Sequence, residues 1–539
     1  MNENHFRVLF LNLVVRNGGS TRYSACVSLK FLRPHAKGIV SNNNINKGWY
    51  HARSVPQSKQ FWLRDFFCDQ IILNSQEDER MNDEKSRKLT WKQYLVVASL
   101  LFGLFFGAGN LIFPLHLGQL AGANWGTAAV GFLITGVLLP LLSVLAVAIT
   151  RAGGVYDIGK PLGAGFAVVF MVLIHATIGP LFGTPRTATV SFTVGVAPFI
   201  PKDMQTVALL VFSAVFFLLA FAFSYHENNI LSNVGKVLNP LFLALLFLVF
   251  VVAFLNPLGN PQTAAVTAAY KHSALVNGFL EGYNTMDALA GLAFGVTVVT
   301  AVRSMGQKDP KSVSKVVAKS GVVAMGAVAL VYLLLILMGA MSLGHFKVSD
   351  NGGVAFNQIV NEYGGLFGQA LLAFLLTVTC LTTAVGLVAA FAQDFHKHFP
   401  KVSYHAWLAL SCLASFFAAN FGLDQIIAWS TPMLMFLYPL SMVLILLSVF
   451  SPLFKRDSVV YFFVILFTVV PALGDMVVAF PAVVSQSQFG LMVTSVRSSL
   501  PLASMGLSWL VPALVGLAVG LVFHVFRRKN LVTAQEEFE

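Results

Sequence analysis

Two carboxylates lie in a stretch of the sequence that is otherwise mostly apolar. Glu281 and Asp287 flank a short polar run, Tyr283-Asn284-Thr285, and apolar residues follow Asp287. A charged side chain is costly in apolar surroundings unless it faces a pathway or a partner. Asp287 is therefore a candidate site for a cation or a proton. Glu281 is a second candidate, unless it lies close to a surface where water solvates it.

A second polar group consists of hydroxyls. Thr377, Thr379, Thr382 and Thr383 occupy four of seven consecutive positions. Thr379 and Thr383 are four residues apart, so they share one face of a helix. Each Thr can bond to a carbonyl of its own helix, but this density exceeds what filler residues require. Hydroxyl and carbonyl oxygens suit a hard cation such as Na⁺.

The residues that surround these groups have the composition of a membrane protein. Of 539 residues, 56% are hydrophobic and only 11% are charged, and the mean hydropathy is +0.74. Soluble domains carry about 25% charged residues. A bilayer accepts apolar side chains on the outer face of a protein, so the composition predicts a membrane protein.

Twelve apolar stretches are long enough to span a bilayer, which takes about 20 residues. They predict an all-α polytopic fold with these spans: 95–118, 126–149, 163–195, 205–224, 230–254, 274–300, 320–343, 366–392, 404–420, 424–450, 458–480 and 503–526.

The basic residues gather in alternate gaps between these spans. From Met81 onward, eighteen Lys and Arg fall on one side and four on the other. The positive-inside rule makes the richer side cytoplasmic and places both termini there. The same pattern accounts for the net charge of +12 without a nucleic-acid partner, and we expect none.

The first span contains residues that interrupt a helix. Gly103, Gly107, Gly109, Asn110 and Pro114 punctuate it; Gly weakens a helix and Pro removes a backbone donor. One interpretation is close helix packing through small residues four apart. The other is a break in the membrane interior, where freed backbone groups line a polar cavity.

The sixth span, with its polar residues between 277 and 287, is the counterpart of the first. The two are five spans apart, so repeats of that length enter the membrane in opposite directions. This predicts inverted repeats at 95–254 and 274–450, with extra helices at 458–526 and a site at the two breaks. Helix N-termini suit a carboxylate and free carbonyls suit a cation, so a zwitterionic amino acid with a small cation fits.

The third span is predicted to bend, because Gly179, Pro180 and Pro185 lie close together. Arg186 follows within the same apolar stretch. It either snorkels to the surface or pairs with Glu281 or another buried acid; we expect pairing. His175 is interpreted as a packed or hydrogen-bonded histidine rather than a ligand.

Three motifs resemble the branched-chain amino acid:cation symporter family, also called the branched-chain amino acid transport system II carriers. They are FGAGNLIFP at 106–114, IGPLFGTPRTATVSF at 178–192 and EGYNTMDALAGLAFG at 281–295, and the likeness covers about 82–530. The resemblance implies uptake of leucine, isoleucine and valine with Na⁺ or H⁺, no cofactor, and a leucine-transporter-like fold of five-plus-five inverted repeats with two extra helices. It also implies a bacterial cytoplasmic membrane.

The resemblance places the site residues by region. Substrate-binding candidates are Gly107, Ala108, Gly109 and Asn110 at the first break and Tyr283, Asn284 and Thr285 at the second. Candidates for cation binding or coupling are Ala108, Thr379, Thr382, Thr383, Asp287 and Glu281, with Na⁺ at Thr382 and Thr383. Arg186 is expected as a structural charge within the membrane.

Several alternatives remain at this point. A proton-coupled carrier would use Asp287, Glu281 or Asp475. A carrier of another small neutral amino acid is the main functional alternative, and a channel is a weaker one because we see no filter motif. An intramembrane enzyme lacks a nucleophile–base or metal constellation, so we expect no catalytic residues.

The two ends of the chain differ from the rest. Residues 1–80 have no sustained periodicity and no place in the family pattern. We expect translation to begin at Met81, with a cytoplasmic tail in the full-length chain as the alternative. Residues 531–539 are expected to form a cytoplasmic tail.

Overall fold

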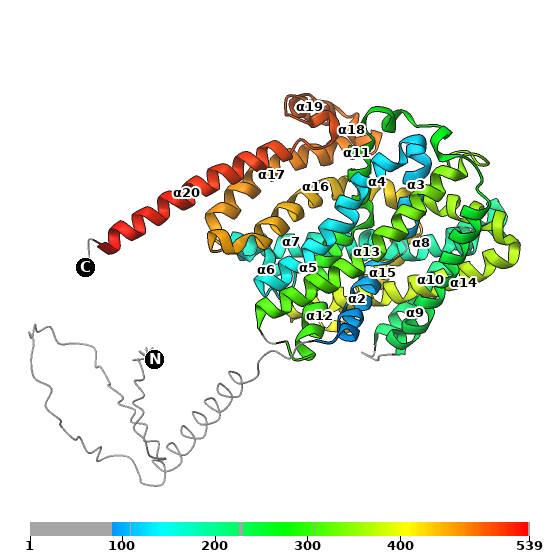
Figure 1. The fold of residues 1–539 in the computed structure, drawn as a ribbon, viewed down its shortest axis with the longest axis horizontal. Helices are drawn as coiled ribbons and strands as arrows, with labels where there is room; N and C mark the ends of the chain where they lie inside the picture. The colour runs from blue at the N-terminus through cyan, green and yellow to red at the C-terminus, as the bar shows by residue number, and fades with distance from the viewer. Residues whose placement is uncertain (1–88, 108, 226–229, 308, 537–539) are drawn as a thin grey trace, which may run out of the picture. The chain divides into compact units, whose positions relative to one another are not determined.

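The computed structural model describes residues 89–107, 109–225, 230–307 and 309–536, and every regular element in these ranges is helical (Figure 1). The predicted all-α architecture is confirmed. The chain divides into two units, Met1–Asp83 and Glu84–Glu539. The first unit lies outside the described residues, so the expectations for residues 1–80 stay predictions.

The twelve predicted spans are all present as helices. The described residues contain nine helical segments long and apolar enough to cross a membrane, and three shorter apolar helices. Together they include part of each predicted span. The polytopic membrane fold is therefore confirmed.

Each of the first three spans consists of two consecutive helices, and the fourth and fifth are one helix each. In chain order these are α2 (Trp91–Phe105), α3 (Gly109–Ala121), α4 (Trp125–Leu133), α5 (Leu139–Thr150), α7 (Ala164–Ala176), α8 (Gly183–Gly195), α9 (Gln205–Tyr225) and α10 (Ile230–Leu255), with the short α6 (Val155–Gly159) between the second and third spans.

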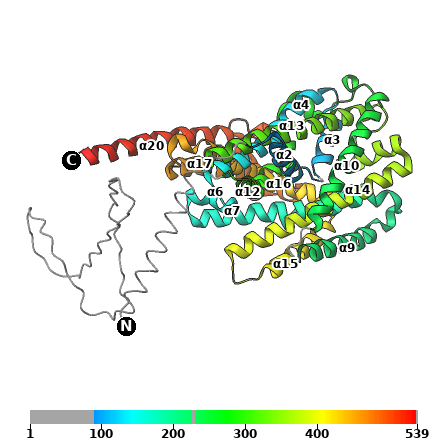
Figure 2. The same ribbon diagram turned by 60° about the horizontal axis from the view of Figure 1, so that its bottom comes forward.

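The next five spans contain α11 (Ala268–Glu281), α12 (Asp287–Ser304), α13 (Pro310–Ser342), α14 (Gly352–His398), α15 (Tyr404–Ala419) and α16 (Leu423–Val449). Figure 2 shows α15 beside α9. Two of these helices are longer than predicted. The side chain of Asp309 accepts the Ser312 N–H and caps α13 with Pro310 at its first position, so this helix begins ten residues before the predicted 320.

The last two spans are α17 (Ser458–Ala479) and α20 (Leu510–Glu536), joined by α18 (Ala482–Ser485) and α19 (Gln488–Ser498). α17 packs against α20 and α16 (Figure 1). α20 continues through residue 536, so most of the segment expected as a tail is helical.

The third span bends where Gly and Pro cluster, as predicted. A π-helical turn at Thr177–Leu181 joins α7 to α8, and Gly179 there has non-helical backbone angles. α14 is also interrupted, at Gly365 with φ of 55°, which lies before the apolar part that begins at Ala373.

Two glycines let α3 and α13 meet backbone to backbone. A Cβ on Gly118 would lie 2.0 Å from the Ile336 carbonyl oxygen, and a Cβ on Gly339 would lie 2.0 Å from the Leu115 carbonyl oxygen. Only glycine fits at either position. This close packing brings Tyr332, which lies two turns before Gly339, into reach of the start of α3.

Candidate functional site

The first break separates α2 from α3 within the first span. α2 ends at Phe105, and Phe106 has extended backbone angles. The Gly107 N–H donates to Asn110 Oδ1 at 2.9 Å, so the Asn110 side chain reaches back three residues, to a position two residues before α3, in the manner of a capping box. Ala108 lies outside the described residues. The helix-break interpretation of this span is confirmed.

The second break separates α11 from α12 in the sixth span. A 3₁₀ turn, Gly282–Thr285, follows α11, and Met286 is in the left-handed region with φ of 60°. A non-glycine residue rarely adopts this conformation, so the surrounding packing must enforce it. α12 begins at once with Asp287. The break predicted for this span is confirmed.

The two breaks meet at Asp287. Its Oδ2 accepts a hydrogen bond of 2.7 Å from Asn110 Nδ2 and one of 2.9 Å from the Tyr332 hydroxyl, and the Asn110 amide also contacts that hydroxyl. Asp287 is only 3% exposed. None of the ion pairs formed among the described residues includes it. The structure therefore holds a buried carboxylate between neutral donors, an arrangement that suits a proton or a cation.

The hydroxyl cluster of α14 faces the first break. A Cβ on Gly107 would lie 3.6 Å from Thr383 Cγ2. The hydroxyls of Thr382 and Thr383 donate to the Thr379 carbonyl at 2.7 and 3.1 Å, so their oxygens keep lone pairs free to accept. The buried Thr379 hydroxyl has no hydrogen-bond partner among the described residues. These oxygens can serve a hard cation, although each donor bond is the local kind that Thr makes in any helix.

Arg186 is buried rather than snorkelling, with 3% of its surface exposed. Nη1 donates to the Asn284 carbonyl at 2.7 Å and Nη2 donates to Ser430 Oγ at 2.8 Å. The expected ion pair with Glu281 is not among the ion pairs of the described residues, although the charge of Glu281 acts on Arg186. Glu281 itself is half-buried and faces the Asn284 side chain.

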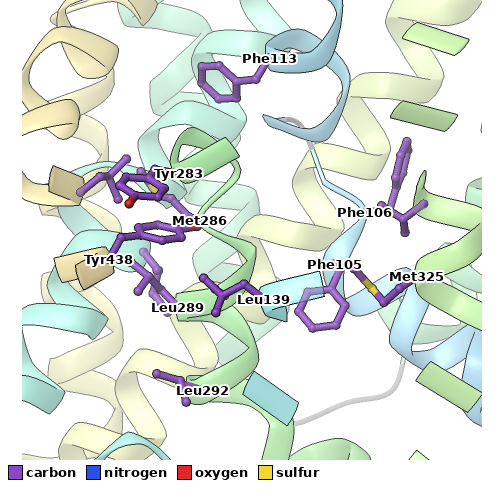
Figure 3. Close-up of a cluster of buried hydrophobic side chains, with 14 of the residues drawn as sticks. Phe105, Phe106, Phe113, Leu139, Tyr283, Met286, Leu289, Leu292, Met325 and Tyr438 are labelled. Carbon is purple, nitrogen blue, oxygen red and sulfur yellow. The ribbon is translucent and has the colours of Figure 1, made fainter. Parts of the chain in front are cut away.

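Aromatic side chains adjoin the second break. Tyr283 stacks on Tyr438 of α16 with ring centroids 4.3 Å apart and an interplanar angle of 9°. Figure 3 shows Met286 beside this pair of tyrosines. Phe113, on α3, lies farther from the pair in the same view. Both tyrosines are at most 2% exposed. They give the site an apolar wall next to its polar backbone groups.

Sequence reasoning missed the residues that other helices bring to the breaks, and Tyr332 and Ser430 are two of them. Tyr332 is the one aromatic residue of α13 and lies in the apolar part of that helix. Ser430 lies in α16 between Trp429 and Thr431. Neither carries a signal in its own segment; only the contact across helices identifies it.

Two other polar residues considered in the sequence analysis, His175 and Asp475, each pair with a side chain outside the two breaks. His175 Nε2 is 2.7 Å from Asp394 Oδ2, so the interpretation of a hydrogen-bonded histidine is confirmed. Asp475, named as one proton candidate, pairs with Arg497 at 2.5 Å.

Comparison with known families decides the class of this fold. The profile of a family described as branched-chain amino acid transport protein matches residues 90–527. The chain belongs to that family. This is a family of transport proteins and not of enzymes. The match covers nearly all of the described residues.

Curated branched-chain amino acid transport proteins agree over most of the chain. The permease BrnQ of Lactobacillus delbrueckii subsp. lactis is 40% identical, over 82% of this chain and 99% of the relative. The permease BraB of Bacillus subtilis is 37% identical, over 81% and 96%. The branched-chain amino acid transport system 2 carrier protein of Pseudomonas aeruginosa is 38% identical, over 79% and 95%.

Two solved structures also align. MhsT in complex with L-phenylalanine has a TM-score of 0.47 and 15% identity, over 80% of this chain and 100% of that chain. Mhp1 in its inward-facing conformation has a TM-score of 0.47 and 11% identity, over 81% and 91%.

Proposed function

We propose that this protein imports leucine, isoleucine and valine across a bacterial cytoplasmic membrane by symport with Na⁺ or H⁺. The observation that carries the mechanism is the contact between the two breaks, where Asn110 Nδ2 lies 2.7 Å from Asp287 Oδ2. Membership of the family and the names of its curated relatives support the substrate class. Both termini are cytoplasmic in this proposal, as the charge bias of the gaps predicts.

The substrate would bind at the two breaks, on the residues proposed from the sequence: Gly107, Ala108, Gly109, Asn110, Tyr283, Asn284 and Thr285. α3 begins at Gly109 in the interior of the protein, and the first turn of a helix has N–H groups without helical partners. These N–H groups suit the carboxylate of an amino-acid substrate. Asn284 Oδ1 is a buried acceptor that no donor of the described part of the chain reaches, which suits the ammonium group.

The wall formed by Tyr283, Met286 and Tyr438 would contact the aliphatic side chain. An apolar pocket discriminates by only about 1–3 kcal/mol per methylene. The three branched-chain amino acids should therefore share one carrier.

Coupling would follow from binding both ligands in one place. A proton or cation at Asp287, or Na⁺ on the oxygens of Thr379, Thr382 and Thr383, would lie next to the backbone groups that bind substrate. Ligands whose sites adjoin change each other's affinity reciprocally. Glu281 is a less direct candidate, because it faces Asn284 rather than Asp287.

Uptake into sealed proteoliposomes tests the proposal. An inward Na⁺ gradient and an inward H⁺ gradient are imposed in separate experiments, and labelled leucine should accumulate under only one of them. Unlabelled isoleucine and valine should compete with leucine for uptake. Alanine serves as the control competitor and should compete weakly. Failure to accumulate leucine under either gradient would rule out symport, and equal competition by alanine would indicate a carrier of small neutral amino acids.

The hydroxyl cluster makes a separate prediction. The variant Thr383→Ala should weaken activation of leucine uptake by Na⁺ about 10-fold, because one charge-assisted oxygen contact contributes roughly 1.5 kcal/mol. The matched control is Thr377→Ala, whose hydroxyl bonds only to the Ala373 carbonyl. The half-saturating Na⁺ concentration of each variant is the readout. Equal values for the two variants would remove Thr383 from the cation site.

A further inference from the structure

We propose that Arg186 binds the carboxylate of the transported amino acid directly, as the positive charge of the substrate site. The inference rests on the proposed function and adds a residue from the third span to the two breaks. It assigns Arg186 a part in recognition, where the sequence suggested only a structural charge.

The position of Arg186 supports this assignment. Nη1 donates to the Asn284 carbonyl at 2.7 Å, and a Cβ on Gly109 would lie 3.8 Å from that same oxygen. The guanidinium and the start of α3 therefore converge on one backbone atom of the second break. The guanidinium carbon also lies 4.8 Å from the centre of the Phe113 ring, about one turn along α3.

The charge of Arg186 is not balanced by a contact within the described structure. The residue is 3% exposed, and no ion pair among the described residues includes it. The two groups that accept its hydrogen bonds, the Asn284 carbonyl and the Ser430 hydroxyl, are neutral. A buried cation of this kind ordinarily faces an anionic partner or a transport pathway. A substrate carboxylate at the breaks supplies such a partner.

The guanidinium also has the donors that a carboxylate needs. Of its five N–H groups, one bonds to Asn284 and one to Ser430, while the buried Nε has no partner within residues 89–107, 109–225, 230–307 and 309–536. Carboxylates prefer to bind two parallel N–H groups of one guanidinium. The bonds to Asn284 and Ser430 hold the plane of the guanidinium, so its unpaired edge is preorganised.

Glu281 is the protein group that competes with this assignment. Its charge acts on Arg186, but it lies half-buried beside the Asn284 side chain. If Arg186 instead paired with Glu281 to close the site, substituting Arg186 would lower the affinity for every ligand to the same extent. If Arg186 binds the substrate carboxylate directly, the same substitution lowers the affinity only for ligands that have a carboxylate.

The test compares L-leucine with L-leucinamide, which has the same shape and ammonium group but no carboxylate. Calorimetry on the purified full-length protein gives both dissociation constants. In Arg186→Gln, leucine affinity should fall about 30-fold or more, since loss of one partner of a buried charge pair has effects of that size, and leucinamide affinity should change less than about 3-fold. Arg527→Gln, which removes an arginine whose side chain is 62% exposed, is the control and should leave both affinities as in the wild type.

Arg186→Lys covers the case in which the Gln variant does not fold, as judged by size-exclusion chromatography. It keeps the charge but not the planar fork, so leucine should weaken about 10-fold and leucinamide should not. Equal losses for both ligands in either variant would overturn the assignment, as would wild-type protein that binds leucinamide as tightly as leucine. Wild-type protein that binds neither ligand would instead contradict the proposed function.

Discussion

Substituting asparagine for Asp287 is expected to abolish gradient-driven accumulation of leucine. The carboxylate is buried and accepts hydrogen bonds from Asn110 and Tyr332, with no cation paired to it among the described residues. Asparagine keeps the shape and one acceptor but cannot take up a proton or neutralise a cation. Because the coupling free energy then disappears, the ratio of internal to external leucine should fall to about one, its value for passive equilibration.

The measurement is accumulation of labelled leucine in proteoliposomes under the gradient that drives the wild type. Exchange of internal for external leucine should persist, which separates loss of coupling from loss of folding. Asp309→Asn removes the same charge from an exposed helix cap, where asparagine serves equally well, and should accumulate leucine normally. Accumulation by Asp287→Asn at the wild-type level would exclude this carboxylate from coupling.

The membrane spans could be predicted because each depends on one local property. About 20 apolar residues in a row make a span whatever they contact, and all twelve predicted stretches are helical. The two breaks were visible for the same reason. Gly107 and the polar run before Asp287 disfavour a continuous helix through their own backbone chemistry, whereas Pro114, expected to interrupt the first span, lies inside α3 and does not end it.

The partners at the breaks could not be predicted, because they depend on packing between helices. Tyr332 reaches Asn110 at the start of α3 because Gly118 and Gly339 let α3 and α13 touch, and both side chains bond to Asp287 there. Nothing in the composition of α13 specifies that neighbour. Arg186 illustrates the same limit: its sequence context fits both snorkelling and pairing, and only the fold shows that it bonds to the Asn284 carbonyl.

The connection between the last two spans depends on one buried ion pair. Arg497 of α19 donates from Nε to Asp475 Oδ1 of α17 at 2.5 Å and from Nη2 to the Ala503 carbonyl at 2.5 Å. The Asp475 side chain is 0% exposed and that of Arg497 is 13% exposed. Arg497→Ala would leave a buried carboxylate without its counter-charge. We expect it to lower the free energy of unfolding by about 3–5 kcal/mol.

Chemical unfolding of the full chain in detergent measures this change in the free energy of unfolding. Arg527→Ala is the matched control, because Arg527 is 62% exposed and lies 3.9 Å from Asp457; such a surface pair contributes about 0–1 kcal/mol. Adding Asp475→Ala to Arg497→Ala should recover part of the loss, since the unpaired charge is then gone and the two substitutions are not additive. A double variant as unstable as the sum of its parts would show that the two side chains act independently. Partial recovery would instead mean that Asp475 is held by Arg497 as a structural group, which leaves Asp287 as the buried acid without a cationic partner in the described part of the transporter.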